Sequence, residues 1–139
     1  MANEAGRQVY RVLIVDDDEV FSGMLKRMLE SMPYYFEIDI ANNGFQAGYK
    51  ARQSAPDLIL LDVMMSGVSG IEVVEALKEE AETRQIRIVG MTGGATKSRV
   101  ARMVNVGAEG VLQKPFTIDD LASAIGEEVL QRFAKPIPA

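Results

Sequence analysis

The stretch VLIVDDDEVF (residues 12–21) decides the fold, because a short apolar run ends abruptly in a row of acids. Four apolar residues precede the acids of positions 16–19, and apolar residues resume at Val20. Like charges about 4 Å apart repel by about 4 kcal/mol at the effective dielectric of a protein surface. We therefore expect another component of the molecule or its ligands to offset this repulsion.

The composition indicates a single globular domain without thiol or imidazole chemistry. The chain has 139 residues, of which 47% are hydrophobic and 25% are charged, so it can bury a core of its own. Cysteine and histidine are absent, which excludes disulfides, thiol catalysis and the commonest general base. A metal ion would have to be held by oxygen atoms, which favours Mg²⁺, Ca²⁺ or Mn²⁺.

The charge and hydropathy patterns argue against several classes of binding partner. The net charge is −5 and the Lys and Arg residues are scattered, which argues against direct binding to nucleic acid or to an anionic membrane. No apolar stretch approaches the length of a membrane span, and the N-terminus lacks the apolar core of a signal peptide. These features predict a protein of the reducing cytoplasm.

Strand and helix patterns alternate along the chain. Short β-branched or apolar runs predict five strands, at 9–15, 36–40, 57–61, 86–91 and 110–113. Apolar residues at helical spacing predict a helix after each strand, the fourth over about 96–106 and capped by Gly107, the last opened by a Thr117–Asp120 capping box and continuing past Val129. Five strand–helix units with short connections predict an α/β fold, a doubly wound parallel sheet with helices on both faces.

The predicted domain occupies nearly the whole chain. We expect an N-terminal extension over residues 1–8, the folded domain over residues 9–132 and a C-terminal tail over residues 133–139, which ends in the loose sequence AKPIPA. No repeat, low-complexity tract or inter-domain linker interrupts the domain.

Polar side chains follow four of the five predicted strands. The first strand ends in Asp16 and Asp17, the third in Asp62, the fourth in Thr92 and the fifth in Lys114. Folds of this class bind ligands outside the carboxyl ends of their strands. Each residue alone has an ordinary explanation, as a helix cap, a turn residue or a solvated lysine. Their joint arrival at one edge of a sheet is an improbable coincidence and indicates a site.

These residue types together suit phosphoryl transfer. Clustered carboxylates form a hard oxygen site for Mg²⁺, and a carboxylate beside the metal can act as nucleophile toward phosphorus. An ammonium and a hydroxyl can pair with the remaining phosphoryl oxygens. The acids then repel one another until a divalent cation lies among them. On this view Asp17→Asn should raise stability in the absence of metal while weakening metal binding.

The ordered set resembles the receiver domain of two-component response regulators, over about residues 9–132. The sequence KPF (114–116) and the glycine of VSG (68–70) are further matches. The resemblance implies a flavodoxin-like sheet with strand order 2-1-3-4-5 and Mg²⁺, or alternatively Mn²⁺, as cofactor. It implies that Asp62 is the phosphoacceptor and that the metal ligands are Asp16, Asp17, Asp62 and the backbone carbonyl of Met64.

The resemblance also implies roles for residues that follow the last two strands. Thr92 and Lys114 would contact the phosphoryl group, and the Lys114–Pro115 peptide bond would be cis. The phosphodonor would be a histidine kinase or a histidine phosphotransfer protein. The output partner would bind the face formed by the fourth helix, the fifth strand and the fifth helix. Such a domain is a signalling phosphoacceptor rather than an enzyme, limited to its own phosphorylation and dephosphorylation.

Four positions depart from the pattern of this family. Ser66 stands where the loop after the phosphoacceptor usually has proline, and Val111 stands where an aromatic residue usually reports phosphorylation by moving inward. Gly93 and Gly94 follow Thr92, so no side chain there shapes access to the phosphoryl group. We therefore expect the switch to use the loop after Thr92 and the helix that follows it.

Two alternatives remain open at the level of sequence. Asp16, Asp18 and Val20 also satisfy the opening motif of haloacid dehalogenase-like phosphatases, which would make Asp16 a nucleophile. Such enzymes need a later acidic pair near a strand end and usually a cap domain, and Asp119-Asp120 instead opens the last helix. The other alternative is a degenerate receiver that binds partners without phosphorylation, against which the intact five-residue set argues.

Overall fold

A parallel β-sheet forms the centre of the computed structural model, which describes residues 2–3 and 5–138. The sheet has the order β2-β1-β3-β4-β5. Its strands, all paired in parallel, are β1 (Tyr10–Val15), β2 (Phe36–Ala41), β3 (Leu58–Asp62), β4 (Arg87–Thr92) and β5 (Gly110–Gln113). The predicted fold class and strand order are both confirmed.

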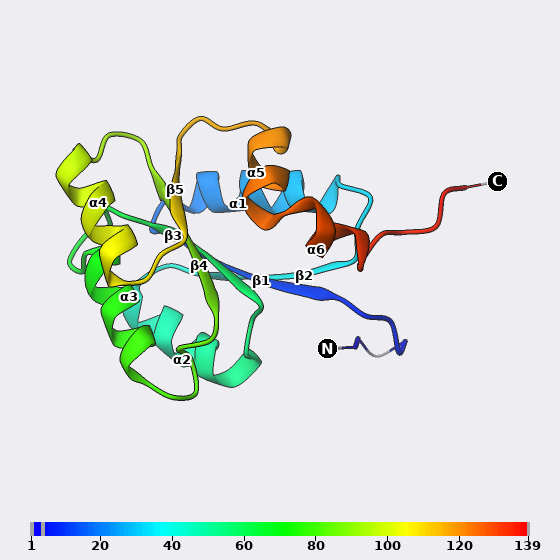
Figure 1. The fold of residues 1–139 in the computed structure, drawn as a ribbon, viewed down its shortest axis with the longest axis horizontal. Coiled ribbons are helices and arrows are strands. Elements are labelled where there is room, and N and C mark those ends of the chain that lie inside the picture. Colours follow the sequence, from blue (N-terminus) through cyan, green and yellow to red (C-terminus); the bar gives the residue numbers. More distant parts are fainter. Residues whose placement is uncertain (1, 4, 139) are drawn as a thin grey trace.

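Two layers of helices cover the sheet (Figure 1). One face carries α1 (Glu19–Glu30), α5 (Ile118–Ile125) and α6 (Glu127–Gln131), and the other carries α2 (Gly44–Ser54), α3 (Gly70–Glu79) and α4 (Lys97–Val106). No helix among the described residues is long and apolar enough to cross a membrane.

The burial of each strand explains its residue pattern. Leu13 and Val15 of β1 pack on the side of α2, α3 and α4, whereas Val12 and Ile14 pack on the side of α1 and α5. A strand covered on both faces has no solvent side, so β1 reads as a continuous apolar run. The edge strand β2 instead alternates between half-buried and exposed residues, as its sequence predicted.

Side-chain caps fix where the helices begin. The Asp18 carboxylate accepts a hydrogen bond from the backbone N–H of Phe21 and so caps α1. Thr117 and Asp120 form the expected capping box of α5, and Gly107 ends α4 with φ of 131°. The charged run after β1 therefore serves two purposes, because its third acid belongs to a helix cap.

The last predicted helix is wrong in one respect, because the structure divides it. α5 ends at Ile125, and Gly126 has φ of 103°, which only glycine adopts without strain. A new short helix, α6, begins at Glu127 and contains Val129. The break frees carbonyl groups at the end of α5, which the side chain of Arg87 then binds.

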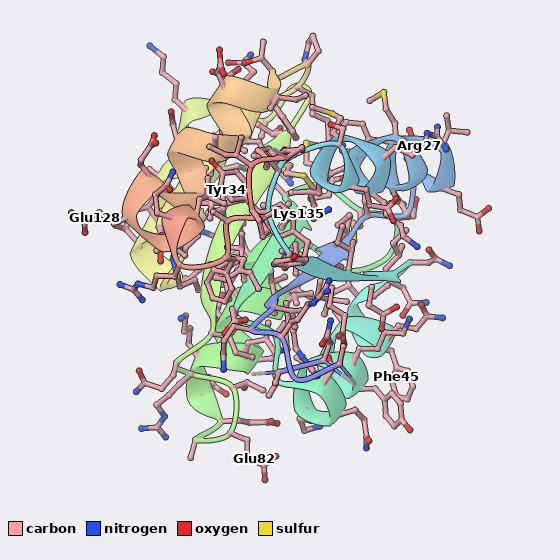
Figure 2. All side chains as sticks on the ribbon, turned by 90° about the vertical axis from the view of Figure 1, so that its right-hand side faces the viewer. Arg27, Tyr34, Phe45, Glu82, Glu128 and Lys135 are labelled. Atoms are coloured by element: carbon pink, nitrogen blue, oxygen red, sulfur yellow. The ribbon has the colours of Figure 1, made fainter. Side chains whose placement is uncertain are left out.

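The first residues of the segment predicted as a tail are attached to the domain. The backbone N–H of Tyr35 donates to the carbonyl of Phe133 (2.8 Å), and the N–H of Lys135 donates to the carbonyl of Pro33 (2.9 Å). Figure 2 looks onto this side of the molecule, with Tyr34 and Lys135 near its centre. The chain therefore leaves the domain beside the α1–β2 connection.

Candidate functional site

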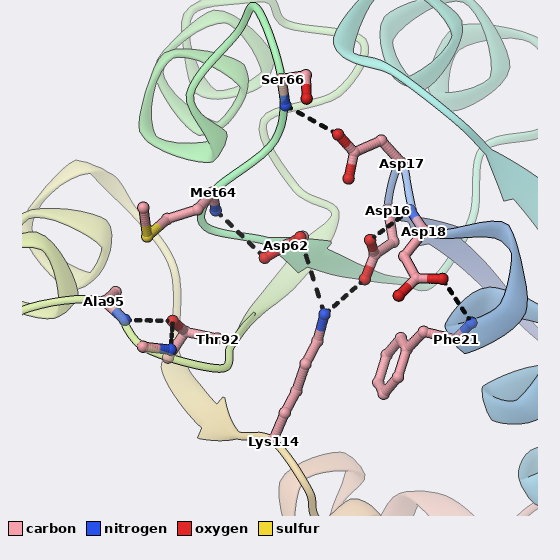
Figure 3. A network of polar contacts seen from close by, with 11 residues as sticks. Asp16, Asp17, Asp18, Phe21, Asp62, Met64, Ser66, Thr92, Ala95 and Lys114 are labelled. Carbon is pink, nitrogen blue, oxygen red and sulfur yellow. Dashed lines mark hydrogen bonds and ion pairs between the residues drawn. The ribbon is translucent and has the colours of Figure 1, made fainter.

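The five residues that sequence analysis assigned to one site lie at one edge of the sheet (Figure 3). Parallel strands bring their carboxyl ends to the same edge, so β1, β3, β4 and β5 deliver Asp16, Asp17, Asp62, Thr92 and Lys114 there. The structure therefore brings together residues that are separated by almost one hundred positions in the chain.

Three carboxylates form the centre of this site. One oxygen atom from each of Asp16, Asp17 and Asp62 lies within 4.8 Å of the others. Asp16 and Asp62 are buried, whereas Asp17 is exposed. Hard oxygen atoms at this spacing fit a divalent cation such as Mg²⁺. The acidic run after β1 thus splits, with two acids at the site and Asp18 in the cap of α1.

Lys114 supplies the one ammonium group that pairs with these acids among the described residues. Its Nζ lies 2.8 Å from Oδ2 of Asp16 and 3.8 Å from Oδ2 of Asp62. The other oxygen of Asp16 accepts a hydrogen bond from the backbone N–H of Asp18. The Lys114–Pro115 peptide bond is cis, as the resemblance implied. Three acids against one ammonium leave the cluster with an excess of negative charge.

The structure divides the acids by their electrostatic environment. Burial in the first place, and the neighbouring Asp16 charge in the second, raise the pKa of Asp62 to about 6, against smaller opposing effects of the Met64 N–H and Lys114. The pKa of Asp17 is instead lowered, chiefly by the backbone N–H of Ser66, which donates to its carboxylate at 2.9 Å.

This division corrects the expectation that removing the charge of Asp17 would stabilise the metal-free fold. The Ser66 hydrogen bond favours the charged form of Asp17, and a neutral asparagine oxygen would accept it less strongly, so the Asp17→Asn change weakens a favourable interaction. The acid whose ionisation the fold opposes is Asp62, because it is buried beside Asp16.

The loop after Asp62 is held close to the strand end by a glycine. A Cβ added to Gly70 would collide with the carbonyl oxygen of Asp62 and would lie 2.9 Å from Cα of Val63. The N-terminus of α3 therefore rests directly on the backbone of the candidate phosphoacceptor. Within the loop, the backbone N–H of Met64 donates to Oδ1 of Asp62 at 3.2 Å. The role expected for the Met64 carbonyl stays a prediction.

Thr92 ends β4 at the same edge of the sheet as the acids, and its hydroxyl oxygen is hydrogen-bonded to the loop that follows it. The hydroxyl oxygen accepts hydrogen bonds from the N–H groups of Gly94 (3.2 Å) and Ala95 (2.7 Å). Among the described residues, no hydrogen bond joins it to Asp62 or Lys114. Both bonds use the hydroxyl oxygen as acceptor, so its hydrogen is still available as a donor.

The expected switch residues differ in how closely they are packed. A Cβ at Gly93 or Gly94 would meet no atom within 4 Å, and neither residue has a left-handed backbone. Val111 instead packs into the core, with its Cγ2 3.1 Å from where a Cβ of Gly90 would lie. Space around the loop after Thr92 is therefore available, and the role of this loop in switching stays a prediction.

Sequence reasoning missed two groups that act on the site. The backbone N–H of Ser66 binds Asp17, and the ring of Phe21 lies under Lys114, whose Nζ is 4.0 Å from the ring centroid. Phe21 fits the apolar pattern of α1, and that pattern does not predict a contact with Lys114. The signal that could have found it is an aromatic residue in the first turn after the acidic run, together with Phe116 directly after the Lys-Pro pair.

The phosphatase alternative loses its second acid in the structure. Asp18, which its motif requires beside Asp16, is the N-cap of α1. The later acidic pair is also unsuitable, because the Asp120 carboxylate accepts a hydrogen bond from the N–H of Thr117 in the capping box. Neither acid is among the carboxylates that cluster at the sheet edge.

Comparisons with known proteins agree with this geometry. The family model of the response regulator receiver domain matches residues 12–126. The phosphate regulon transcriptional regulatory protein PhoB of Rhizobium meliloti is 32% identical over 126 residues, which cover 91% of this chain and 54% of that protein, so the chain spans about half the length of this relative. The polar-differentiation response regulator DivK of Brucella anthropi is 35% identical over 107 residues, which cover 77% of this chain and 85% of that protein.

A solved structure is similar over most of its length. The signal receiver domain of a DNA binding response regulator protein from Colwellia psychrerythraea matches with a TM-score of 0.79 and 36% identity, covering 86% of this chain and 98% of that one. The match of sequence, fold and carboxylate cluster does not favour the phosphatase alternative. The chain therefore belongs to the response regulator receiver family, whose members act in phosphorylation-based two-component signalling.

Proposed function

We propose that Asp62 is the residue that receives the phosphoryl group. The observation that carries this proposal is the cluster itself, in which Asp62 lies beside two further carboxylates and within 3.8 Å of the Lys114 ammonium. One carboxylate oxygen of Asp62 would form the new bond to phosphorus while the bond from phosphorus to a donor histidine nitrogen breaks. A histidine kinase or a histidine phosphotransfer protein is the proposed donor.

The acids of the cluster fit a divalent cation. Asp16, Asp17 and Asp62 offer oxygen atoms within 4.8 Å of one another, and we propose that they hold Mg²⁺, or alternatively Mn²⁺, together with the carbonyl of Met64. When bound, the cation supplies positive charge that neutralises the phosphoryl oxygens.

The side chains around Asp62 have distinct proposed roles. Lys114 reaches Asp16 and Asp62 from β5, so its ammonium is in place to pair with a phosphoryl oxygen. Thr92 would donate its hydroxyl hydrogen to another oxygen after its loop has moved. Phosphorylation would then shift the population of positions of this loop and of α4, which alters the face of α4, β5 and α5 that binds the output partner.

The chain would catalyse only its own phosphorylation and dephosphorylation. The described residues include no histidine, cysteine or second carboxylate cluster that could run a separate turnover reaction. A degenerate receiver would not need the complete acidic cluster with its paired lysine. The proposed function is therefore a phosphorylation switch.

Labelling by acetyl phosphate tests the proposal. The parent should gain one phosphoryl group in the presence of Mg²⁺, seen by intact mass, and Asp62→Asn should gain none. Asp18→Asn is the matched control, because it removes a neighbouring negative charge while asparagine still caps a helix. The proposal fails if Asp62→Asn is labelled like the parent or if chelation of the metal changes nothing. Continuous turnover of a generic phosphate ester would instead support the phosphatase alternative.

A further inference from the structure

The Lys114 ammonium touches an aromatic ring as well as two acids. Its Nζ lies 4.0 Å from the centroid of the Phe21 ring, 2.8 Å from Asp16 and 3.8 Å from Asp62 (Figure 3). The negative face of an aromatic ring attracts a cation that lies over it within about 6 Å. The side chain of Lys114 is 18% exposed, so water competes little with this contact.

Two further contacts fix the position of Phe21, one through its backbone and one through its ring. The backbone N–H of Phe21 binds the capping carboxylate of Asp18, which fixes the start of α1 relative to the acids at the end of β1. Phe116 meets the Phe21 ring nearly at right angles, at 85° with 5.9 Å between centroids. Because Phe116 follows Lys114 by two residues, the segment that carries the ammonium also anchors the ring beneath it.

We propose that Phe21 is a positioning residue that holds the Lys114 ammonium beside Asp62 through a cation–π contact. This inference rests on the proposed function, in which Asp16 is needed by the cation and Asp62 by the phosphoryl group. Of the three groups that contact the ammonium, the ring is the one without another task. Its attraction therefore persists when the charges of the acids are taken up by other ligands.

Fluorination of the ring separates this role from simple packing. Phenylalanine analogues with one, two and three ring fluorines keep nearly the same shape while they progressively weaken the negative face. With Mg²⁺ present, we expect the rate of Asp62 labelling by acetyl phosphate to fall stepwise across the series. For the trifluoro ring we expect a loss of about fivefold, equivalent to about 1 kcal/mol.

A spectroscopic measurement reports the contact directly. The protons of the Lys114 side chain near Nζ should show an upfield ring-current shift in the parent, and Phe21→Leu should abolish it. We expect this shift without metal, with Mg²⁺, and with beryllofluoride as a phosphoryl mimic. Phe21→Tyr, which keeps an aromatic face, should preserve both the shift and the labelling rate, whereas Phe21→Leu should lose rate like the trifluoro ring.

Two controls make each outcome decisive. The same fluorination at Phe133, at the other edge of the sheet, should leave the labelling rate unchanged. If the rate does not change across the Phe21 series, or if the ring-current shift is absent in the parent, Phe21 only packs and this inference is wrong. Labelling that still depends on Asp62 would in that case leave the proposed function intact, whereas labelling of Asp62→Asn would remove the proposed function itself.

Discussion

The two edges of the sheet carry charged clusters of opposite design. At the amino edge, Arg87 uses all five of its N–H groups, which donate to Glu109, Tyr10 and the carbonyls of Ala124 and Ile125. One cation faces one acid there, and the remaining partners are neutral. At the carboxyl edge, three acids face a single ammonium. A balanced cluster stabilises the fold, whereas an unbalanced one is left with charge for a ligand.

The pKa shifts express the same contrast. Arg87 lowers the pKa of Glu109 by a hydrogen bond between the two side chains, so the fold favours the charged acid. Burial beside Asp16 raises the pKa of Asp62 to about 6, so the fold opposes the charged acid. The stability contributions of the two clusters should therefore change in opposite directions with pH, and only the cluster at the carboxyl edge should respond to a divalent cation.

The largest expected effect is the loss of Arg87. Arg87→Met leaves the tyrosine hydroxyl and two carbonyls without their donor, and we expect the free energy of unfolding to fall by about 3 kcal/mol. Urea denaturation measures it. Arg84→Met is the control, because Arg84 is exposed and its side chain makes no ion pair among the described residues. A loss of stability no greater than that of Arg84→Met would contradict the claim that the Arg87 cluster at the amino edge stabilises the fold.

The second-largest expected effect is a pH dependence of the free energy of unfolding, caused by the titration of Asp62. Because its pKa is about 6 in the fold and about 4 in the unfolded chain, the folded state retains a proton that the unfolded state has lost. Stability should therefore fall by roughly 2–3 kcal/mol as the pH rises through this window. Unfolding at several pH values measures it, and Asp62→Asn should remove the slope. The same slope in Asp62→Asn would assign it to another group.

Addition of Mg²⁺ should act at the carboxyl edge alone. At ten times its dissociation constant the cation should stabilise the parent by about 1.4 kcal/mol, since it binds the folded arrangement of acids. Thermal unfolding should show the same gain in Arg87→Met and a smaller one in Asp17→Asn. An equal gain in Asp17→Asn would mean that the cation binds elsewhere.

The smallest expected effect is that of Glu109→Gln. The Glu109 side chain is 44% exposed, so solvent screens its pair with Arg87 and the loss should be about 0.5 kcal/mol at neutral pH. Its pKa is lowered in the fold, so this contribution is fully present above the unfolded pKa and is lost as the pH falls through the lower pKa of the folded state. This slope is opposite in sign to that of Asp62. An effect of the substitution that is as large at low pH as at neutral pH would show that the charge is not its cause.

The position of the site could be predicted because sheet topology collects strand ends. Once strands were assigned, Asp16, Asp62 and Lys114 had to meet at one edge. The unequal roles of the acids could not be predicted, because they depend on the backbone N–H of Ser66 and on the depth of Asp62. These are properties of the packed structure rather than of residue type.

The break after α5 is a feature of the fold that could not be predicted from the sequence either. A glycine within a helix costs only about 1 kcal/mol, so Gly126 alone did not predict an end. The break is favoured because Arg87, far away in the chain, binds the carbonyls that it exposes. Likewise, Phe21 fits the apolar pattern of α1, and only the packed structure places its ring under Lys114.

Gly70, at the start of α3, packs directly against the backbone of Asp62 on one side of the site. No room for even a methyl group exists between α3 and the Asp62 carbonyl, so a displacement of Asp62 in that direction would have to move the helix as well. At Gly93 and Gly94, by contrast, no atom lies within 4 Å of where a side chain would begin. The surroundings of the proposed phosphoacceptor are thus uneven, and we expect motion that begins at Asp62 to meet less resistance toward the loop before α4 than toward α3.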